Sequence, residues 1–400
     1  MFDFTLTEEQ SLLQATARDF AQRKLAPAMR AHEEARALTD DAARAFAELG
    51  LAMSSLPEAV GGQGLGMLEA VLCEEELGAA DPGAAVAAPG PGPFGRALVE
   101  LGSEEQARAW LAPFADAPAT SWGAVAWSEA RALAERPGFA TTAVPEGDGY
   151  RLKGVKSFVT SAPRAELFLV FAQVDAAAGW GGLGAFVVKK NEGVSVGARH
   201  RTLGLDAAAF ADVTIDAWVP ADRRLARGGD PVALARFFLK QGLVTAARAV
   251  GLSRAAFDVS REYCEGRKAF GKPIGHFQAV AFKLADRLMD ADSARWLVWR
   301  AAWAWDSNDD EARALRASAQ AIATAVEAAM RCGDDAVQLH GGAGFMRDYP
   351  VEKMMRDAKQ LALSAPTATT LDQLATALDL GLPLDPALTL PTPETQPIFT

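Results

Sequence analysis

Residues 336–359, AVQLHGGAGFMRDYPVEKMMRDAK, contain the end of one helix, a glycine cluster and a charged second helix. The glycines at 341, 342 and 344 let a ligand approach the backbone closely, and exposed N–H groups there can cradle a phosphate. A glycine-rich joint between helices explains the same pattern, with His340 as a local hydrogen-bonding residue. The interleaved charges of residues 356–359, RDAK, are typical of a solvated helix face.

Two earlier segments carry residue types that suit a nucleotide or a flat ring. Residues 267–278, RKAFGKPIGHFQ, follow a long helix, and there Arg267 can bind a phosphate while Phe270 can stack on an adenine. A basic last turn with a glycine stop is the structural alternative. In residues 156–160, KSFVT, strand alternation predicts Phe158 and Thr160 on one face, where an aromatic and a hydroxyl can hold a flat ring. An ordinary strand is the alternative there.

The order of helical and extended segments predicts three domains. Residues 1–120 are expected to be helical, and residues 121–230 alternate short apolar runs with turn residues, which predicts a β domain. Residues 231–380 are expected to form a helical bundle, with long helices at 232–266, 276–307, 309–333 and 351–363. Residues 381–400 are proline-rich and predict a loose tail. The fold class is α+β, mainly α: an N-terminal helical domain, a middle β-barrel or β-sandwich and a C-terminal four-helix bundle.

Composition narrows the class of protein. The 400 residues are 50% hydrophobic with a net charge of −11, which excludes a largely disordered chain and argues against a nucleic-acid partner. The three cysteines are too few and too scattered for a disulfide framework or a zinc site, so no metal site is expected. The sequence has no apolar run long enough for a membrane span, and its first residues lack the features of a signal peptide. We therefore expect a cytoplasmic protein.

Taken together and in this order, the segments resemble the acyl-CoA dehydrogenases, which use FAD. The similarity extends over roughly residues 1–370 and rests on the two C-terminal stretches above. It also includes LPEAVGGQGLG at 56–66, EEELGAADPG at 74–83, GVKSFVTSA at 154–162 and RTLGLDAAAFADVTIDAWVP at 201–220. The resemblance implies FAD as cofactor and an acyl-CoA or other acyl thioester as substrate. It also implies an electron-transfer flavoprotein or similar acceptor as partner, and a homo- or hetero-oligomer.

The resemblance also implies roles for individual residues. Arg267 and Phe270, with Gln278 nearby, would hold the pyrophosphate and adenine of a neighbouring subunit's FAD. Gln338 with the paired glycines Gly341 and Gly342 would meet the same FAD. In the β domain, Ser128, Phe158 (usually Trp in the family) and Thr160 would lie at the flavin.

The positions that carry chemistry in the family depart from its pattern. A glutamate takes the α-proton in most members, and the matching position here is Ala365. A minority of members carry the base on the first bundle helix, where this chain has Gln241. Neither side chain accepts a proton, and a general base contributes about 10²–10⁴-fold in rate. The resemblance therefore implies a divergent member of the family that lacks the usual catalytic glutamate.

Two further segments depart from the family. Leu239 and Gly242 replace an aspartate and an arginine that contact acyl-CoA. Residues 128–135, SEARALAE, replace a glycine-rich loop that contacts flavin and substrate, although Ser128 and Glu129 are kept. Glu129 or Asp372 is a candidate for a displaced base.

Four functions remain open. The first is an active FAD-dependent dehydrogenase, and the second is a non-catalytic subunit that donates residues to a partner's FAD site. The third is a flavin monooxygenase on the same scaffold, which needs no α-proton base. The fourth is a helical scaffold without flavin.

Overall fold

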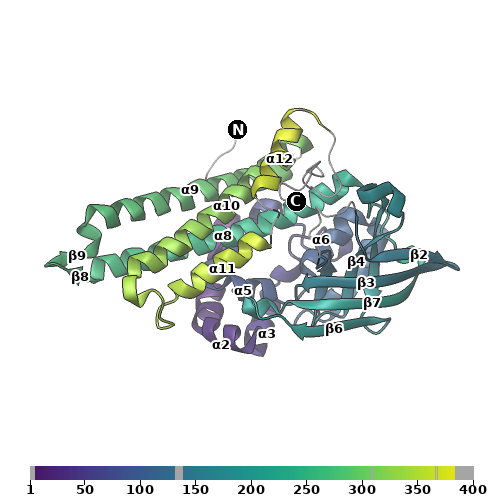
Figure 1. Cartoon of the computed structure of the whole chain (residues 1–400), viewed down its shortest axis with the longest axis horizontal. Coiled ribbons are helices and arrows are strands. Elements are labelled where there is room, and N and C mark those ends of the chain that lie inside the picture. The colour runs from purple at the N-terminus through teal and green to yellow at the C-terminus, as the bar shows by residue number, and fades with distance from the viewer. Residues whose placement is uncertain (1–4, 131–137, 308–309, 365, 367, 383–400) are drawn as a thin grey trace, which may run out of the picture.

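The computed structural model describes residues 5–130, 138–307, 310–364, 366 and 368–382. Long helices occupy one end of the molecule and a curled sheet occupies the other (Figure 1). The expected fold class is confirmed. The expected limits between domains stay a prediction, and most of the predicted tail lies outside the described residues.

The N-terminal part is helical, as expected. Its helices are α1 (Glu8–Phe20), α2 (Met29–Ala35), α3 (Asp40–Glu48), α4 (Met67–Ala80), α5 (Pro82–Ala87), α6 (Gly92–Leu101) and α7 (Glu104–Asp116). At the start of α1, the Thr7 hydroxyl accepts from the Gln10 amide and the Gln10 side chain accepts in return from Thr7, so the capping box forms. Two helices, α5 and α6, begin within the Pro/Gly-rich segment 81–95, because proline is well tolerated in a helix's first turn.

The middle part contains one seven-stranded sheet in the order β1-β4-β2-β3-β7-β6, with β5 paired to β4. Its strands are β1 (Gly123–Ala126), β2 (Thr142–Glu146), β3 (Gly149–Val159), β4 (Leu167–Gln173), β5 (Leu183–Lys189), β6 (Val194–Arg199) and β7 (Ala211–Pro220). β4 is buried along its whole length, and β7 alternates between buried and more exposed residues. Thus β4 lies between two packed layers and β7 has a solvent face.

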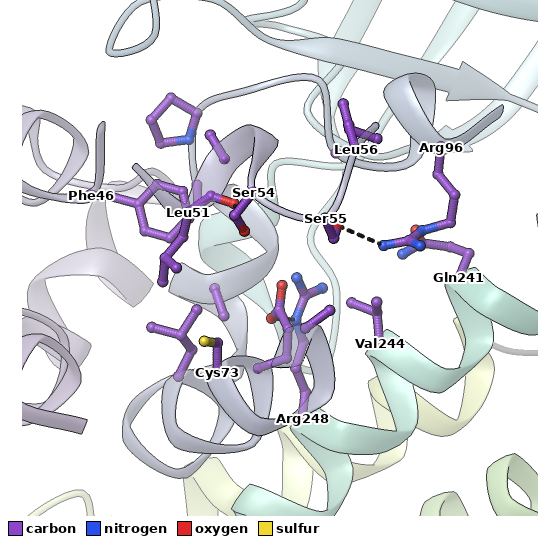
Figure 2. A pocket seen from close by; sticks show the side chains of 18 residues that line it. Phe46, Leu51, Ser54, Ser55, Leu56, Cys73, Arg96, Gln241, Val244 and Arg248 are labelled. Atoms are coloured by element: carbon purple, nitrogen blue, oxygen red, sulfur yellow. Dashed lines mark hydrogen bonds and ion pairs between the residues drawn. The ribbon is translucent and has the colours of Figure 1, made fainter. Parts of the chain in front are cut away.

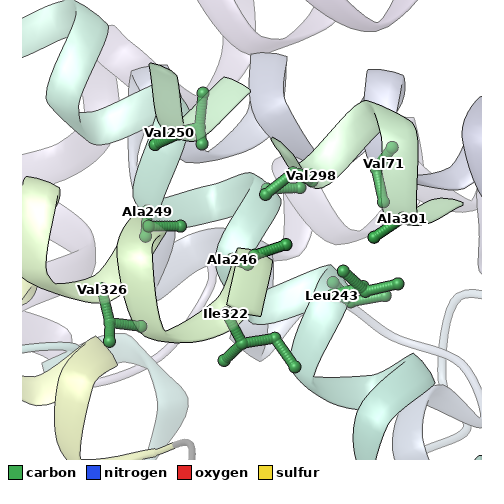
Figure 3. Close-up of a cluster of buried hydrophobic side chains, with 14 of the residues drawn as sticks. Val71, Leu243, Ala246, Ala249, Val250, Val298, Ala301, Ile322 and Val326 are labelled. Carbon is green, nitrogen blue, oxygen red and sulfur yellow. The ribbon is translucent and has the colours of Figure 1, made fainter. Parts of the chain in front are cut away.

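The C-terminal part is a bundle built around one central helix. Its helices are α8 (Pro231–Gly266), α9 (Gln278–Ser307), α10 (Glu311–His340), α11 (Val351–Leu363) and α12 (Ala368–Asp379). α10 packs against the other four. The core is rich in alanine, with Leu243, Val298 and Ile322 filling the space between helices (Figure 3). Small side chains let these helices approach closely.

Two glycines bring α4 against α8. A Cβ at Gly78 would collide with the backbone of Arg248, and one at Gly251 would collide with the carbonyl of Glu75. The close approach sets Arg248 of α8 beside Glu74 of α4, and their side chains form an ion pair of 2.7 Å. This contact builds one wall of the cavities described below.

The charged segment at 356–359 is a solvated face only in part, because Lys359 is exposed whereas Asp357 is buried. Lys353 and Asp357 of α11 are 4% and 2% exposed. Lys353 Nζ donates to Asp81 at 3.0 Å and to Asp357 at 2.6 Å, and Asp357 accepts from the Leu205 amide at 2.7 Å. Burial lowers the pKa of Lys353, but the two carboxylates outweigh burial and raise it. The network ties α11 to the N-terminal helices and to the segment before β7. The pattern of alternating charge therefore predicted the wrong environment for Asp357.

No helix in the described ranges is long and apolar enough to cross a membrane. The expected cytoplasmic location stays a prediction. Cys73, Cys264 and Cys332 are buried free thiols. Burial and neighbouring glutamates raise the pKa of Cys73 to about 12, so this thiol stays protonated.

Candidate active site and flavin-binding residues

A cavity of about 160 Å³ lies where the sheet meets α8 and α11. Thr160, just after β3, and Ser364, just after α11, line it together with Gln241 and Thr245 of α8. The cavity therefore brings together Thr160, expected at the flavin, and Gln241, one of the two positions at which the family carries its base. Ser364 directly precedes Ala365, which lies outside the described residues.

A second cavity of about 90 Å³ lies beside the first, along α8. Gln241, Arg248 and Ala88 line both cavities, so the two are neighbours. Figure 2 shows Arg96 of α6 and Gln241 of α8 on the same side of this second cavity, with Arg248 below. Sequence reasoning missed Arg96, Arg248 and Glu74, because no local motif marks them and they meet only through packing of three helices.

Phe158 lies at an irregularity of β3. The register with β7 shifts between Lys156 and Val159, and Phe158 has a φ of 55°. Its ring is 58% exposed and lies 4.8 Å from the His200 ring, which is held by Asp212 at 2.9 Å. Simple alternation does not describe this segment: Phe158 is presented to solvent while Thr160 lines the cavity.

Ser128 and Glu129 lie beside the same strand. Ser128 is exposed, and its carbonyl accepts from the Ser157 amide at 2.8 Å. Glu129 accepts from the Ala140 and Thr141 amides at 2.7 and 2.8 Å and pairs with buried Lys156 at 3.2 Å. Burial raises the pKa of Glu129, but Lys156 and the backbone donors outweigh burial and lower it. Glu129 thus has a structural role, and the loop residues 131–137 lie outside the described residues.

The residues expected at a nucleotide lie on the far end of the bundle. Arg267 ends α8 and precedes a small hairpin of β8 (Lys268–Ala269) and β9 (Lys272–Pro273). At its tip Phe270 has a φ of 50° and Gly271 a φ of 81°, and the Phe270 side chain is 95% exposed. Among the described residues Arg267 has no carboxylate partner. An apolar ring and a cation are thus both presented to solvent, which suits a ligand held outside this chain.

The glycine cluster lies at the same end. Gln338 is exposed on the last turn of α10, and Gly341 and Gly342 follow it. Gly341 has a φ of 55° and a ψ of −133°, and a Cβ at either glycine would meet no atom within 4 Å. Gln278, exposed, begins α9. The open backbone at the two glycines leaves room for a ligand.

His340 serves local structure, as expected. Its Nδ1–H donates to the Ala336 carbonyl at 2.8 Å, and its ring stacks on Tyr263 at 4.2 Å. Burial lowers the pKa of His340, which keeps the ring neutral. Its Nε2 is buried and has no hydrogen-bond partner among the residues that the structure describes.

The two groups of predicted residues are far apart in one chain. The hairpin β8–β9 lies at the end of the bundle away from the sheet, whereas Phe158 and Thr160 belong to the sheet (Figure 1). One chain cannot bring both groups to one flavin in this conformation. A site that uses both groups needs a second chain.

The departures from the expected chemistry have structural consequences. Leu239 is fully buried in the bundle core, and a Cβ at Gly242 would lie 2.5 Å from the Ile322 side chain. Neither position has room for a charged side chain that contacts substrate. Asp372 is exposed on α12 and lines neither cavity. In the described part of the chain, no group of three or more His, Cys, Asp or Glu could hold a metal ion.

Comparison with known proteins identifies the family. Models of the N-terminal, middle and C-terminal domains of acyl-CoA dehydrogenases match residues 7–118, 124–218 and 228–365. The chain belongs to the acyl-CoA dehydrogenase family. The probable acyl-CoA dehydrogenase YngJ of Bacillus subtilis is 33% identical over 378 residues, which is 92% of this chain and 96% of the relative.

Two further similarities extend over most of the chain. The caffeyl-CoA reductase–Etf complex subunit CarC of Acetobacterium woodii is 32% identical over 358 residues, which is 88% of this chain and 93% of the relative. The butyryl-CoA dehydrogenase structure from Megasphaera elsdenii superposes with a TM-score of 0.87 at 29% identity, over 95% of this chain and 100% of that one. The chain is an acyl-CoA dehydrogenase-like oxidoreductase, and FAD is the cofactor of its family.

The residues present fit FAD. Exposed Phe270, the exposed cation Arg267 and the open backbone at Gly341 and Gly342 match the flat, apolar and anionic parts of a dinucleotide. At the other end, the cavity beside Thr160 is bordered by the apolar rings of Trp122 and Phe210. These residues are therefore compatible with FAD, while the position on α8 at which a minority of the family would carry its base holds the amide of Gln241.

Proposed function

We propose that this protein is an FAD-dependent dehydrogenase of an acyl thioester. The observation that carries the proposal is the cavity shared by Thr160 and Gln241, in a chain that matches the family along most of its length. When bound, FAD supplies the acceptor for the hydride that leaves the β-carbon of the acyl group. The carrier of the acyl group, coenzyme A or a carrier protein, is left open by the residues on the cavity wall.

The residues of this chain would bind and orient the reactants. Thr160 and Phe158 would contact the flavin ring, with the Thr160 hydroxyl as a hydrogen-bonding group. The acyl chain would run along α8, past Gln241, into the cavity bounded by Val244 and Leu56. These apolar walls exclude water from the reacting carbons.

The α-proton needs an acceptor, and the residues that line the two cavities include few groups that could accept it. Gln241 is an amide, and Glu74, the one carboxylate among the described residues that line either cavity, is held by Arg248 at 2.7 Å. Loss of a general base costs about 10²–10⁴-fold in rate. We therefore propose a slow dehydrogenase in which substrate binding is intact and proton removal limits the rate.

We further propose that FAD lies between two chains. Support comes from the separation of the two groups of flavin residues, and from an exposed stripe on α9. Phe282, Met289 and Trp296 recur every seven residues, two helical turns apart, and are 59%, 59% and 36% exposed. A second copy or a related subunit would cover this stripe and bring Phe270 to the flavin.

The same amide at position 241 favours a second function, that of a subunit donating Arg267, Phe270 and Gln338 to the FAD of a catalytic partner. The Etf complex named for the relative CarC supports an electron-transfer flavoprotein as the electron acceptor in either case. A flavin monooxygenase would also need no α-proton base, and oxygen consumption with a flavin reductase would reveal it.

The test is the visible spectrum of the FAD-loaded protein, titrated without oxygen against a panel of acyl-CoA thioesters. Bleaching of the flavin absorbance by any of them supports the dehydrogenase. If thioesters bind and the flavin stays oxidised, the dehydrogenase proposal is refuted. Co-purification with a glutamate-bearing relative would then support the partner subunit.

A further inference from the structure

The second cavity has an unusual wall for an aliphatic chain. Apolar side chains, among them Phe46, Leu51 and Val244, form much of its lining. The guanidinium groups of Arg96 and Arg248 also line it, with a single carboxylate, Glu74. Because Arg248 and Glu74 neutralise one another, the charge left on the wall is that of Arg96.

Arg96 has only weak partners in the described part of the chain. Its Nη1 lies 3.5 Å from Met67 Sδ and its Nη2 lies 3.4 Å from Ser55 Oγ (Figure 2). Its Nε is buried without a hydrogen-bond partner. An arginine guanidinium has five N–H donors in a fixed fork that matches a carboxylate. Arg96 therefore has donor capacity to spare, facing a cavity.

The nearest carboxylates are engaged elsewhere. Glu100, one turn further along α6, accepts from Lys240 at 2.7 Å and lies 3.7 Å from Arg236. Glu74 pairs with Arg248. No ion pair between Arg96 and a carboxylate occurs among the described residues. A cation that is taken out of water without a counter-charge is costly, so an anion in the cavity would be stabilising.

The size of the cavity limits the ligand. A volume of about 90 Å³ holds several water molecules at roughly 10–15 Å³ each, which corresponds to a short chain of a few carbon atoms. The cavity adjoins the one that contains Thr160, because Gln241 and Arg248 line both. A ligand that enters past Gln241 would reach Arg96 with its far end.

We propose that the second cavity selects a short acyl group that ends in a carboxylate, which Arg96 binds through its free N–H donors. This inference rests on the proposed function, because it takes the cavity past Gln241 as the acyl site. The Arg248–Glu74 pair contributes polarity without net charge. Phe46, Leu51 and Val244 contact the methylene groups between the thioester and the carboxylate.

The experiment compares two thioesters of equal chain length on the FAD-loaded protein. Glutaryl-CoA carries the terminal carboxylate and pentanoyl-CoA lacks it. We expect glutaryl-CoA to bind about ten- to a hundredfold more tightly by calorimetry, the range of a charge-assisted hydrogen bond. Arg96→Gln should abolish this preference, so that the two thioesters bind with about equal affinity, whereas Arg96→Lys should keep part of it.

The matched control is Arg44→Gln, which removes a positive charge from an exposed position on α3. It should keep the preference for glutaryl-CoA. Flavin content and melting temperature are measured for every variant, so that misfolding is separated from altered recognition. If Arg96→Gln misfolds, the Arg96→Lys protein and the wild-type preference still decide the question.

Binding and chemistry fail in distinguishable ways. Equal affinity of the wild-type protein for the two thioesters overturns the inference, even if one of them bleaches the flavin. A preference that Arg96→Gln leaves intact in a folded protein overturns it as well. If the preference depends on Arg96 while the flavin stays oxidised with both thioesters, the inference stands and the dehydrogenase proposal fails.

Discussion

Replacing Gln241 with glutamate should increase the rate of flavin reduction strongly. The side chain lies on the wall of both cavities, and the change from amide to carboxylate keeps its length and shape. Two helical turns further along α8, Arg248 is already paired with Glu74, so the new carboxylate would not be tied up in that ion pair. A positioned general base contributes about 10²–10⁴-fold, or roughly 3–5 kcal/mol of barrier.

The assay is stopped-flow absorbance of the flavin after anaerobic mixing with a thioester that the wild-type protein binds. We expect the Gln241→Glu rate to exceed the wild-type rate by about 10²–10⁴-fold, with affinity changed only a few-fold. Gln320→Glu, the same change at an exposed position of α10, is the control and should leave the rate unchanged. A Gln241→Glu rate equal to wild type, with substrate bound and flavin present, would refute the placement of the α-carbon beside this side chain.

Three further outcomes follow from the contacts described above. Phe270→Ala should leave the unfolding free energy within about 0.5 kcal/mol of wild type, because the ring is 95% exposed. The same substitution should weaken FAD binding, as measured by flavin fluorescence. Unchanged FAD affinity would contradict the proposed role of the β8–β9 hairpin. Lys353→Met should lower the free energy of unfolding, measured in urea, by about 3–5 kcal/mol, because it leaves two buried carboxylates without their cation. A decrease below about 1 kcal/mol would show that the network contributes little to stability. Burial raises the pKa of Glu76, but hydrogen bonds from Arg18 and Arg254 outweigh burial and lower it. The stabilisation that ionised Glu76 gives the folded state is therefore present above the usual glutamate pKa of about 4.3. It is lost as the pH falls through the lowered pKa. The stability difference between wild type and Glu76→Gln, measured from pH 7 to pH 3, should shrink in that window, and a constant difference would contradict this origin.

The long helices were the most predictable part of the fold. The expected helix at 232–266 corresponds to α8 at Pro231–Gly266, because its amphipathic pattern is long and Arg267 and Gly271 lie just beyond its end. The helix expected at 309–333 runs on to His340. Gly333, at which it was expected to end, is a packing residue, since a Cβ there would lie 2.9 Å from Met355 Cα. A glycine inside a helix and one that ends a helix look alike in a single sequence.

The residues proposed to bind flavin could be selected from the sequence because they lie in short motifs, whereas the residues of the cavity walls could not. Arg96, Glu74 and Arg248 come from three helices and meet only because Gly78 and Gly251 let α4 approach α8. The environment of Asp357 also depends on distant residues, since it is set by Lys353 and the Leu205 amide. Charge pattern along one helix carries no information on such partners. The cofactor could therefore be predicted from local motifs. The proposed position of the acyl group depends on tertiary packing and could not be predicted from the sequence.

Product analysis shows directly whether this protein dehydrogenates an acyl thioester. The FAD-loaded protein is incubated without oxygen with each acyl-CoA of the panel, and the thioester is examined by mass spectrometry while the flavin absorbance is recorded. We expect one thioester to lose two hydrogens in a one-to-one ratio to the flavin that is reduced, with Gln241→Glu reaching the same end point faster. Bound thioesters that all keep their mass, beside a flavin that stays oxidised, would contradict it.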